Sequence, residues 1–348
     1  MLIIDLRSDT LTMPTQEMLR SVFNYRFGDS GRLDENNRGG DPTVNELEDY
    51  AAAITGMERA IFLPSGTMGN HVAMLTHCYA NDVAIMDSCQ HLYRTEKATC
   101  DKRFGQIRPV FYHLTKNGYP DIDEIKNLLQ THQAKVLCLE NTHNWAGGTC
   151  IPLHVLKEIH TLAKTAGVPI HMDGARLFNA AIALQVDPRE ICKYADTVMF
   201  CLSKGLGAPI GSVLCSTSAF AAKAVETRKL LGGNMRQAGV VAAYGIYALK
   251  HNIQDLKEDH RRTKIAQEAL KRSLTKVRVA DNVQTNILIL NIEGLGVTAE
   301  EYIERAKNMG VWLSKSTDTH IRMVFYRDID DIQLYQAVEI LEKLDETL

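Results

Sequence analysis

Two side chains that could do chemistry together follow two apolar runs in the middle of the chain. Asp173 comes directly after the run at 168–172, and Lys204 lies in a glycine-bearing turn after the run at 197–202. Both runs are typical of buried strands in a parallel sheet, and the residues between them suffice for one crossover helix. Because open α/β sheets bind ligands at the carboxyl ends of their strands, we expect Asp173 and Lys204 to face one site.

A carboxylate and an amine in this arrangement suit pyridoxal 5'-phosphate. The lysine forms a Schiff base with the cofactor's aldehyde, and the carboxylate keeps a proton on the ring nitrogen so that the ring can take up electrons. Gly66 and Thr67 stand where a predicted strand turns into a helix, so their backbone N–H groups suit a phosphate. Each feature alone is common in ordinary loops and helix caps. Their combination predicts the cofactor.

The composition describes an ordinary globular protein and excludes several classes of partner. The 348 residues are 45% hydrophobic and 23% charged, with a net charge of -3, which leaves no basic field for nucleic acid. No apolar run reaches the length of a membrane span, and the N-terminus lacks the basic start and apolar core of a signal peptide. We therefore expect a cytoplasmic protein that binds a small molecule, with no nucleic-acid or membrane partner.

The eight cysteines support neither a disulfide framework nor a metal centre. They form no CxxC pair, and none has the close spacing to histidine that zinc ligands show. Several lie in apolar runs, so we expect free and largely buried thiols and no metal ion.

The elements that must position Asp173 and Lys204 alternate between strand and helix over the first 250 residues. This alternation predicts a large α/β domain with a mainly parallel sheet. We expect strands at 59–63, 83–86, 107–112, 136–139, 168–172, 197–202 and 210–215, and helices at 15–22, 43–54, 68–78, 122–130, 153–164 and 219–231, with Thr43 as a plausible N-cap and a loop at 27–40.

The pattern changes in the last part of the chain. A single long helix over 238–274 is expected to lead into a second unit, a small α+β domain within 251–348. Its predicted elements are strands at 286–292, 311–314 and 321–325 and helices at 299–308 and 332–344.

Seven collinear stretches resemble the threonine aldolase family of fold-type I pyridoxal phosphate enzymes. They keep the family's order and spread over most of the chain: DLRSDT (5–10), GDPTVNELE (40–48), FLPSGTMGN (62–70), LENTHN (139–144), HMDGARLFNA (171–180), CLSKGLGAPIGS (201–212) and GGNMRQAG (232–239). The resemblance implies a seven-stranded, mainly parallel sheet and the cleavage of a β-hydroxy-α-amino acid of the L-threonine or L-allo-threonine type to glycine and an aldehyde. It also implies a homotetramer or homodimer with shared active sites.

The resemblance assigns cofactor-binding roles residue by residue. Lys204 is implied as the Schiff-base lysine and Asp173 as the partner of the ring nitrogen. Gly66 and Thr67, joined by Ser203, are implied to bind the phosphate.

Further roles concern the ring face and the substrate. His91 is implied to stack on the ring, and Arg176 to lie near the ring oxygen and the substrate carboxylate. His143 resembles the histidine near the substrate's β-hydroxyl, where it would act as a base directly or through a water. Glu96 matches a family glutamate that could orient this water; a solvent-exposed helix residue is the competing interpretation.

The substrate's α-carboxylate is implied to bind Ser8 and Arg322, the arginine through a bidentate pair. For Arg322 the competing interpretation is an ordinary edge-strand arginine. Arg228 or Arg236 could reach a cofactor phosphate across a subunit interface.

Several positions depart from the family pattern. Arg38 stands where a tyrosine is usual, Trp145 replaces a small residue, and the segment after His91 is basic through Arg94, Lys97, Lys102 and Arg103. We hypothesise a reshaped, more cationic pocket mouth that includes Arg38 and favours a bulkier or acidic substrate. The competing interpretation is that these residues face solvent or another subunit.

Two other classes of function remain open at this point. Lys204, Asp173 and the phosphate turn would serve a β-eliminating lyase, a racemase or a transaldolase equally well. A non-catalytic cofactor-binding or scaffold protein of the same fold is the second alternative, and the intact Lys204 speaks against it.

Overall fold

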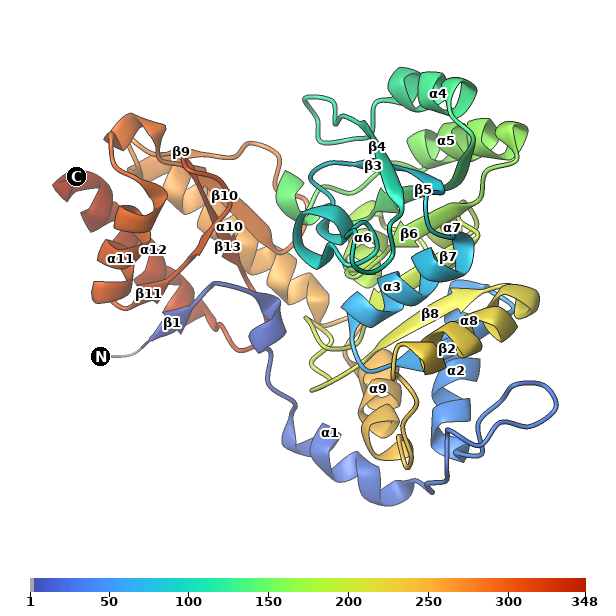
Figure 1. The fold of residues 1–348 in the computed structure, drawn as a ribbon. Helices are drawn as coiled ribbons and strands as arrows, with labels where there is room; N and C mark the ends of the chain where they lie inside the picture. Colours follow the sequence, from blue (N-terminus) through green and yellow to red (C-terminus); the bar gives the residue numbers. More distant parts are fainter. Residues whose placement is uncertain (1–2) are drawn as a thin grey trace.

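The computed structural model describes residues 3–348, which form a larger part on the right of Figure 1 and a smaller part on the left. The larger part is built on a sheet in the order β2-β8-β7-β6-β5-β3-β4. β8 runs antiparallel to both its neighbours, whereas the other pairs are parallel. The expected α/β fold with a mainly parallel seven-stranded sheet is confirmed. Its strands are β2 (Arg59–Leu63), β3 (Val83–Asp87), β4 (Arg108–Tyr112), β5 (Ala134–Glu140), β6 (Ile170–Asp173), β7 (Thr197–Cys201) and β8 (Ser212–Ser216).

Helices cover both faces of this sheet because successive strand residues point to opposite sides. In β7, Val198 and Phe200 pack in the core beneath α2, α5, α6 and α9, whereas Met199 and Cys201 pack beneath α3 and α8. The helices are α2 (Pro42–Thr55), α3 (Gly66–His77), α4 (Ile122–Thr131), α5 (Leu153–Ala166), α6 (Leu177–Leu184), α7 (Pro188–Cys192), α8 (Ser218–Leu230) and α9 (Gly239–His251).

The smaller part is an α+β unit to which both ends of the chain contribute. Its four-stranded antiparallel sheet has the order β12-β13-β10-β9. Ile4 and Leu6 join its core, because β1 pairs with β11 in parallel. The elements are β1 (Ile4–Asp5), β9 (Arg278–Val279), β10 (Ile287–Asn291), β11 (Val311–Trp312), β12 (Ser314–Lys315) and β13 (His320–Val324), with α10 (Leu256–Ser273), α11 (Ala299–Asn308) and α12 (Asp331–Thr347).

The prediction of one continuous helix over 238–274 was wrong. The segment forms α9 and α10 with a break between them. Asn252, at the end of α9, is buried and donates its side-chain amide to the carbonyl oxygen of Leu206 at 2.7 Å. The chain bends there because this amide binds the loop that follows Lys204.

The predicted N-cap of α2 was wrong by two residues. Asp41, not Thr43, caps the helix, and Pro42 occupies its first turn. The Asp41 carboxylate accepts the N–H groups of Thr43 and Val44 at 3.0 and 3.2 Å. An aspartate before a proline satisfies the first free N–H groups as well as a threonine would.

Two expectations drawn from composition can be compared with the structure. Within residues 3–348, no helix combines the length and apolar character that crossing a membrane requires. All eight cysteines are free, and six of them are buried, which confirms the expected thiols.

Candidate active site

β6 and β7 bring Asp173 and Lys204 to the same edge of the sheet. The two strands are adjacent and parallel, with Asp173 opposite Met199. Asp173 ends β6 and is 4% exposed, and Lys204 follows β7 in the turn before β8. The positive charge of Lys204 is close enough to act on both Asp9 and His91.

The turn from β2 into α3 lies at this edge as well. Ser65 caps α3 by accepting the N–H of Met68 at 3.1 Å, while the N–H groups of Gly66 and Thr67, at the very start of the helix, have no intrahelical acceptor. A Cβ atom on Gly66 would lie 2.6 Å from the Sγ of Cys201, at the end of β7. Only a glycine therefore lets this turn, whose free N–H groups suit an anion, approach the strand that precedes Lys204.

His91 and Asp173 are connected through two other side chains. Nδ1 of His91 is 3.0 Å from Oε1 of the buried Glu96 carboxylate. Asn70 donates one amide to both carboxylates, at 3.0 Å to Glu96 and at 2.8 Å to Oδ2 of Asp173. Burial lowers the pKa of His91, but the bond to Glu96 and the charge of Asp173 outweigh it, and the net pKa is raised. Sequence analysis named three of these residues and missed Asn70.

The same cluster brings possible metal ligands together. Donor atoms of His91, Glu96 and Asp173 lie within 4.8 Å of one another. Asn70 already binds one oxygen of each carboxylate, and His91 uses Nδ1 on Glu96. We therefore attribute the cluster to the cofactor site.

Arg176 binds the N-terminal segment. Its Nε and Nη2 donate to the two carboxylate oxygens of Asp9, both at 2.7 Å, and its Nη1 donates to Oδ1 of Asn144 at 3.2 Å. Burial raises the pKa of Asp9, but the charge and hydrogen bonds of Arg176 outweigh it and lower the pKa to about 2. The arginine expected near the ring oxygen thus directs two of its three hydrogen bonds to Asp9, a residue that was not predicted as part of the site.

Arg322 is buried without an acidic partner. Nη1 donates to Oδ1 of Asn144 at 2.6 Å, Nη2 donates to the carbonyl oxygen of Arg7 at 3.1 Å, and the buried Nε has no partner within residues 3–348. Burial lowers the pKa of Arg322 to about 10, and the nearby charge of Arg176 adds to this effect. A carboxylate entering the site would complete the hydrogen bonds of this guanidinium.

Arg94 and Trp145 lie next to Arg322. The guanidinium carbon of Arg94 is 4.2 Å from the centre of the Trp145 ring, and that of Arg322 is 5.3 Å from it. Arg94 also donates to the carbonyl oxygen of Ser316 at 2.8 Å. Arg103, in the same basic segment, has a side chain that is 90% exposed and lies outside this group.

His143 directs both ring nitrogens into the protein. Nδ1 accepts the N–H of Ala146 at 3.2 Å, so Nε2 carries the proton that it shares with Oδ2 of Asp87 at 2.9 Å. Burial lowers the pKa of His143, but the charge of Glu140 and the bond to Asp87 outweigh it, and the net pKa is raised. Asp87, the last residue of β3, is another group that sequence analysis missed.

Of the remaining predicted residues, Ser8 and Ser203 are neighbours of site residues in the chain, whereas Arg38 binds elsewhere. Ser8 lies between Arg7, whose carbonyl binds Arg322, and Asp9, and Ser203 directly precedes Lys204. Arg38 does not join them in this chain. Its guanidinium pairs with Asp49 of α2 at 2.9 Å, because the loop before α2 folds back on that helix.

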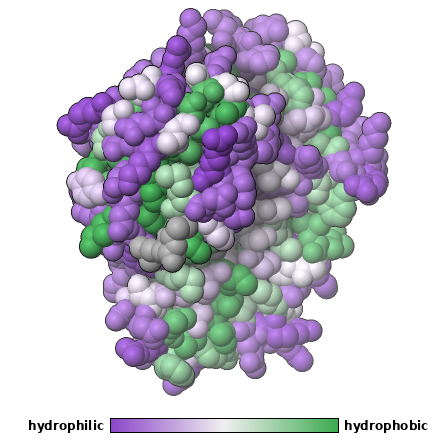
Figure 2. Space-filling view, turned by 90° about the vertical axis from the view of Figure 1, so that its left-hand side faces the viewer, coloured by the Kyte–Doolittle hydropathy of each residue, from purple (hydrophilic) through white to green (hydrophobic). Residues whose placement is uncertain are grey.

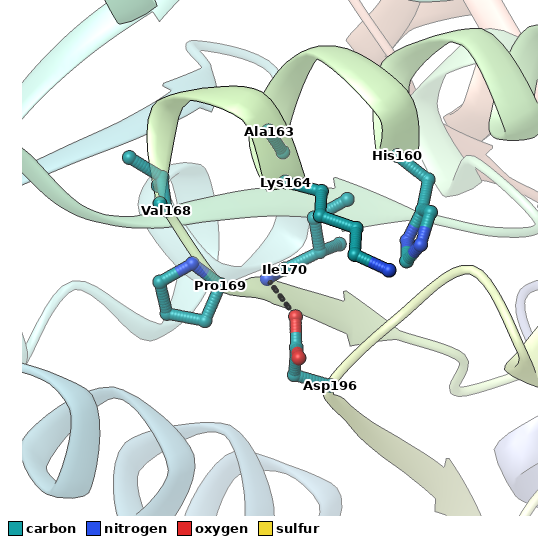
Figure 3. A pocket seen from close by; sticks show the side chains of 8 residues that line it. His160, Ala163, Lys164, Val168, Pro169, Ile170 and Asp196 are labelled. Atoms are coloured by element: carbon teal, nitrogen blue, oxygen red, sulfur yellow. Dashed lines mark hydrogen bonds between the residues drawn. The ribbon is translucent and has the colours of Figure 1, made fainter.

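A separate cavity of about 340 Å³ lies at the opposite edge of the sheet (Figure 3). His160, Lys164, Pro169 and Asp196 are among its lining residues. Asp196 accepts the N–H of Ile170, the first residue of β6, at 2.7 Å. Because ligands of open α/β sheets bind at the carboxyl ends of the strands, this cavity is not part of the site.

The residues at the carboxyl edge fit pyridoxal phosphate. An amine, a carboxylate, an imidazole and a helix N-terminus reach one place from four different elements. Arg228 adds a buried guanidinium that donates to the carbonyl oxygen of Phe62 in β2 and has a buried Nε without a partner among residues 3–348. An anion bound beside α8 would supply the acceptor that this Nε lacks.

The comparisons with known proteins agree with this geometry. Residues 5–295 match the model of the beta-eliminating lyase family. The low-specificity L-threonine aldolase 1 of Arabidopsis thaliana is 35% identical, over 98% of this chain and 96% of the plant protein. The low specificity L-threonine aldolase of Escherichia coli K12 is 36% identical, over 96% of this chain and 97% of the bacterial protein.

Solved structures show the same fold. A threonine aldolase of Leishmania major has a TM-score of 0.79 at 15% identity, over 98% of this chain and 99% of that one. A serine palmitoyltransferase of Sphingomonas wittichii has a TM-score of 0.77 at 17% identity, over 99% and 88%. The cofactor is therefore pyridoxal phosphate, and the chain belongs to the beta-eliminating lyase family and, within it, to the threonine aldolases.

Proposed function

We propose that this chain cleaves a threonine-type β-hydroxy-α-amino acid to glycine and an aldehyde. The observation that carries the proposal is Arg322, a buried guanidinium with no acidic partner within residues 3–348. The α-carboxylate of an amino acid would form a bidentate pair with it. Ser8, next to the Arg7 carbonyl that Arg322 binds, is our second ligand for the same carboxylate. The relatives named low-specificity L-threonine aldolases support the choice of a threonine-type substrate.

Pyridoxal phosphate, when bound, supplies a ring that takes up the electron pair of the breaking Cα–Cβ bond. We assign Lys204 to hold the cofactor's aldehyde, Asp173 to accept the N–H of its ring, and His91 to cover the ring face. Gly66 and Thr67 would bind the phosphate with their free N–H groups. A fixed α-carboxylate would restrict rotation about the substrate's bonds, so that one bond at Cα is aligned for cleavage.

The proton of the β-hydroxyl group needs a base, and we assign this role to His143 acting through a water. Asp87 fixes the tautomer in which Nδ1 is the basic nitrogen, and the single lone pair of Nδ1 must exchange the long 3.2 Å bond from the N–H of Ala146 for the water. Oε1 of Glu96 binds His91 and Asn70, whereas its buried Oε2 has no hydrogen-bond partner within residues 3–348. We assign Glu96 to hold the ring of His91 through Oε1, and Oε2 is the acceptor left for a water.

A specific observation favours a second candidate substrate with an acidic group on the departing aldehyde. Arg94 and Arg322 lie around the same Trp145 ring. The hydrogen bond of Arg94 goes to a carbonyl oxygen, not to a carboxylate. If one guanidinium binds the α-carboxylate, the other would be available for a second carboxylate, as in 3-hydroxyaspartate.

A substrate panel tests both candidates. The purified holoenzyme is assayed with L-threonine, L-allo-threonine, phenylserine and 3-hydroxyaspartate, and glycine and aldehyde are quantified. Lys204→Ala should abolish glycine formation. Pyruvate and ammonia from serine, without glycine from any of the four compounds, would contradict the aldolase in favour of a β-eliminating lyase.

The acidic candidate has its own control within the panel. Arg94→Met should lower kcat/KM for 3-hydroxyaspartate about tenfold or more while sparing threonine, because one charge-assisted hydrogen bond is worth roughly 1.5–3 kcal/mol. Arg103→Met removes an exposed cation from the same segment and should change neither value. Threonine as clearly the best substrate, with no selective effect of Arg94→Met, would remove the acidic candidate.

We also assign the chain to a homodimer or homotetramer with shared active sites, in the cytoplasm. Met13 and Phe23, which flank α1 (Gln16–Ser21), are 67% and 86% exposed. Green apolar side chains interrupt the purple surface near the lower end of Figure 2, the level at which Figure 1 draws α1. A second copy of the chain would cover them. Arg236, on the exposed turn after α8, remains our candidate for a neighbour's cofactor phosphate, and Arg38 could contribute only at such an interface.

A further inference from the structure

A buried row of polar side chains runs behind Asp173, between α3 and the sheet. His171 and Asp173 project from the same face of β6 because they are two residues apart. Thr197 is the register partner of His171 on β7. Asn70 and His77 share one face of α3, because seven residues make about two helical turns. Helix spacing and strand register therefore bring all five residues together.

Their hydrogen bonds form one continuous row. Oδ2 of Asp173 accepts from Nδ2 of Asn70 at 2.8 Å, and Oδ1 of Asn70 is 3.1 Å from Nε2 of His171. Nδ1 of His171 is 2.9 Å from Oγ1 of Thr197, which is 3.1 Å from Nε2 of His77. All these distances suit a hydrogen bond.

The proton positions in the row follow from the burial of its two histidines and from the carboxylates that Asn70 faces. Burial lowers the pKa of His171 to about 4, with the charge of Asp173 opposing, and burial lowers the pKa of His77 to about 3. Both rings are therefore neutral at ordinary pH. Because the NH2 group of Asn70 faces two carboxylates, its Oδ1 accepts from Nε2 of His171. Nδ1 of His171 then accepts from the hydroxyl of Thr197, which accepts from Nε2 of His77.

This pattern leaves Asn70 a single amide orientation. Its NH2 group has two hydrogens, and they reach Glu96 at 3.0 Å and Asp173 at 2.8 Å. A flipped amide would turn its oxygen toward two carboxylates and its N–H groups toward the N–H of His171. Both contacts would be repulsive, and the buried donors would have no acceptor.

We propose that Asn70 is a positioning residue that sets the geometry of the cofactor slot, with His171 and Thr197 holding its amide in the one productive orientation. Through Asp173 the amide fixes the group for the ring nitrogen, and through Glu96 it fixes His91, the group for the ring face. One side chain thereby keeps the two contacts in register. The inference rests on the cofactor site described above and adds to it a residue that touches neither cofactor nor substrate.

The matched comparison uses three single variants. Asn70→Ala removes both amide bonds and leaves the N–H of His171 without an acceptor. Thr197→Val keeps the shape of the side chain and removes only the hydroxyl that orients His171. Asn179→Ala is the control, because Asn179 is also a buried asparagine bonded to a histidine, His260 at 3.0 Å, but lies in α6 outside the row.

The readouts are cofactor affinity and spectrum, not turnover. The dissociation constant of pyridoxal phosphate is measured on the cofactor-free protein, the visible absorbance of the bound cofactor is titrated against pH, and Tm is measured with and without cofactor. Asn70→Ala should raise the dissociation constant about tenfold to a hundredfold, because it leaves a buried donor and two carboxylates without their partner. It should also shift the pH midpoint of the absorbance and reduce the gain in Tm on cofactor binding. Thr197→Val should act in the same direction but less strongly.

The control separates positioning from simple stability. Asn179→Ala should lower Tm equally with and without cofactor and leave the dissociation constant and the pH midpoint unchanged. Asn70→Ala with wild-type affinity and midpoint would overturn the inference, and if that variant does not fold, wild-type values for Thr197→Val overturn it instead. A wild-type protein that does not bind pyridoxal phosphate would reject the cofactor site itself, a result distinct from a failure of Asn70 alone.

Discussion

Arg322 is a buried guanidinium whose hydrogen bonds within the protein are incomplete, and this indicates which group its ligand must supply. Its hydrogen bonds go to an amide and a carbonyl oxygen, and its buried Nε has no acceptor among residues 3–348. Buried charges are normally paired, so the missing acid is expected to arrive with the substrate.

Replacing Arg322 by lysine tests this expectation. A lysine keeps the charge but cannot form the planar bidentate pair, so kcat/KM for threonine should fall by about a hundredfold, mainly through a raised KM. Arg7→Lys is the control, because the Arg7 side chain pairs with Asp5 on the surface. Steady-state kinetics of the purified holoenzymes measure both, and an unchanged KM in Arg322→Lys would contradict the assignment.

Single site residues could be predicted from the sequence where their position depends only on the strand that they follow. Asp173 and Lys204 could be paired because each follows a predicted strand of the same sheet. Asp9, Asn70 and Asp87 could not, because their partners are 167, 103 and 56 residues away along the chain. Such contacts depend on how helices and loops pack over the sheet. The hydrophobic periodicity of the sequence predicts the elements but not this packing.

Among the elements, the N-terminal segment has a structural role that its sequence pattern did not predict. β1 pairs in the smaller part, and the short η1 helix (Asp9–Leu11) then brings Asp9 against Arg176. The ion pair fastens the segment that carries Ser8 to the turn after β6.

Asp9→Asn should therefore destabilise the protein in a pH-dependent way. The pKa of Asp9 in the folded state is about 2, below its ordinary value of 3.8, so its stabilising effect is present above pH 3.8 and is lost as pH falls toward 2. At neutral pH the variant leaves the buried Arg176 uncompensated, which should cost about 3–5 kcal/mol of unfolding free energy. The difference should shrink in acid.

Urea unfolding of wild type and variant at neutral and acidic pH measures this effect. Asp5→Asn serves as the control, because the Asp5–Arg7 pair lies at the surface and should be worth less than about 1 kcal/mol. An Asp9→Asn protein as stable as Asp5→Asn at neutral pH would show that the N-terminal segment is held by β1 alone.

The predicted elements failed where a tertiary contact overrode a local pattern. The helical period of 238–274 gave no sign of a break. The break depends on a contact with another segment, the hydrogen bond from Asn252 to Leu206, and a local pattern does not show such a contact. The choice of Thr43 over Asp41 as the cap rested on the threonine-to-glutamate spacing, which fits a helix start two residues too late. Elements whose ends are local, such as β2 and α11, were predicted at their observed bounds.

In the whole molecule, α10 joins the two parts and also borders the active site. Figure 1 shows it running from the sheet of the larger part to the strands of the smaller part. A Cβ atom on Gly205, the residue after Lys204, would lie 2.7 Å from the Leu256 side chain and 3.6 Å from a carboxylate oxygen of Asp259. The turn that carries Lys204 is thus packed directly against the first turn of α10.

Asp259 makes this junction sensitive to pH. Burial raises the pKa of its carboxyl group, the charge of Asp9 adds to the effect, and Arg262 and Arg327 offset only part of it, so that the pKa is about 8. Because this value is above the ordinary value of 3.8, the favourable contribution of the neutral form is complete below pH 3.8 and is lost as pH rises through 8. Asp259→Asn, which is always neutral, should therefore be more stable than wild type above pH 8, by on the order of 3 kcal/mol, and nearly equal to it in acid. Tm measured across this pH range tests the prediction, with Glu268→Gln, an exposed carboxylate further along the same helix, expected to follow the wild type throughout. A constant difference between Asp259→Asn and wild type at every pH would mean that this carboxyl group titrates as it would in water, and that the junction beside Lys204 is open to solvent.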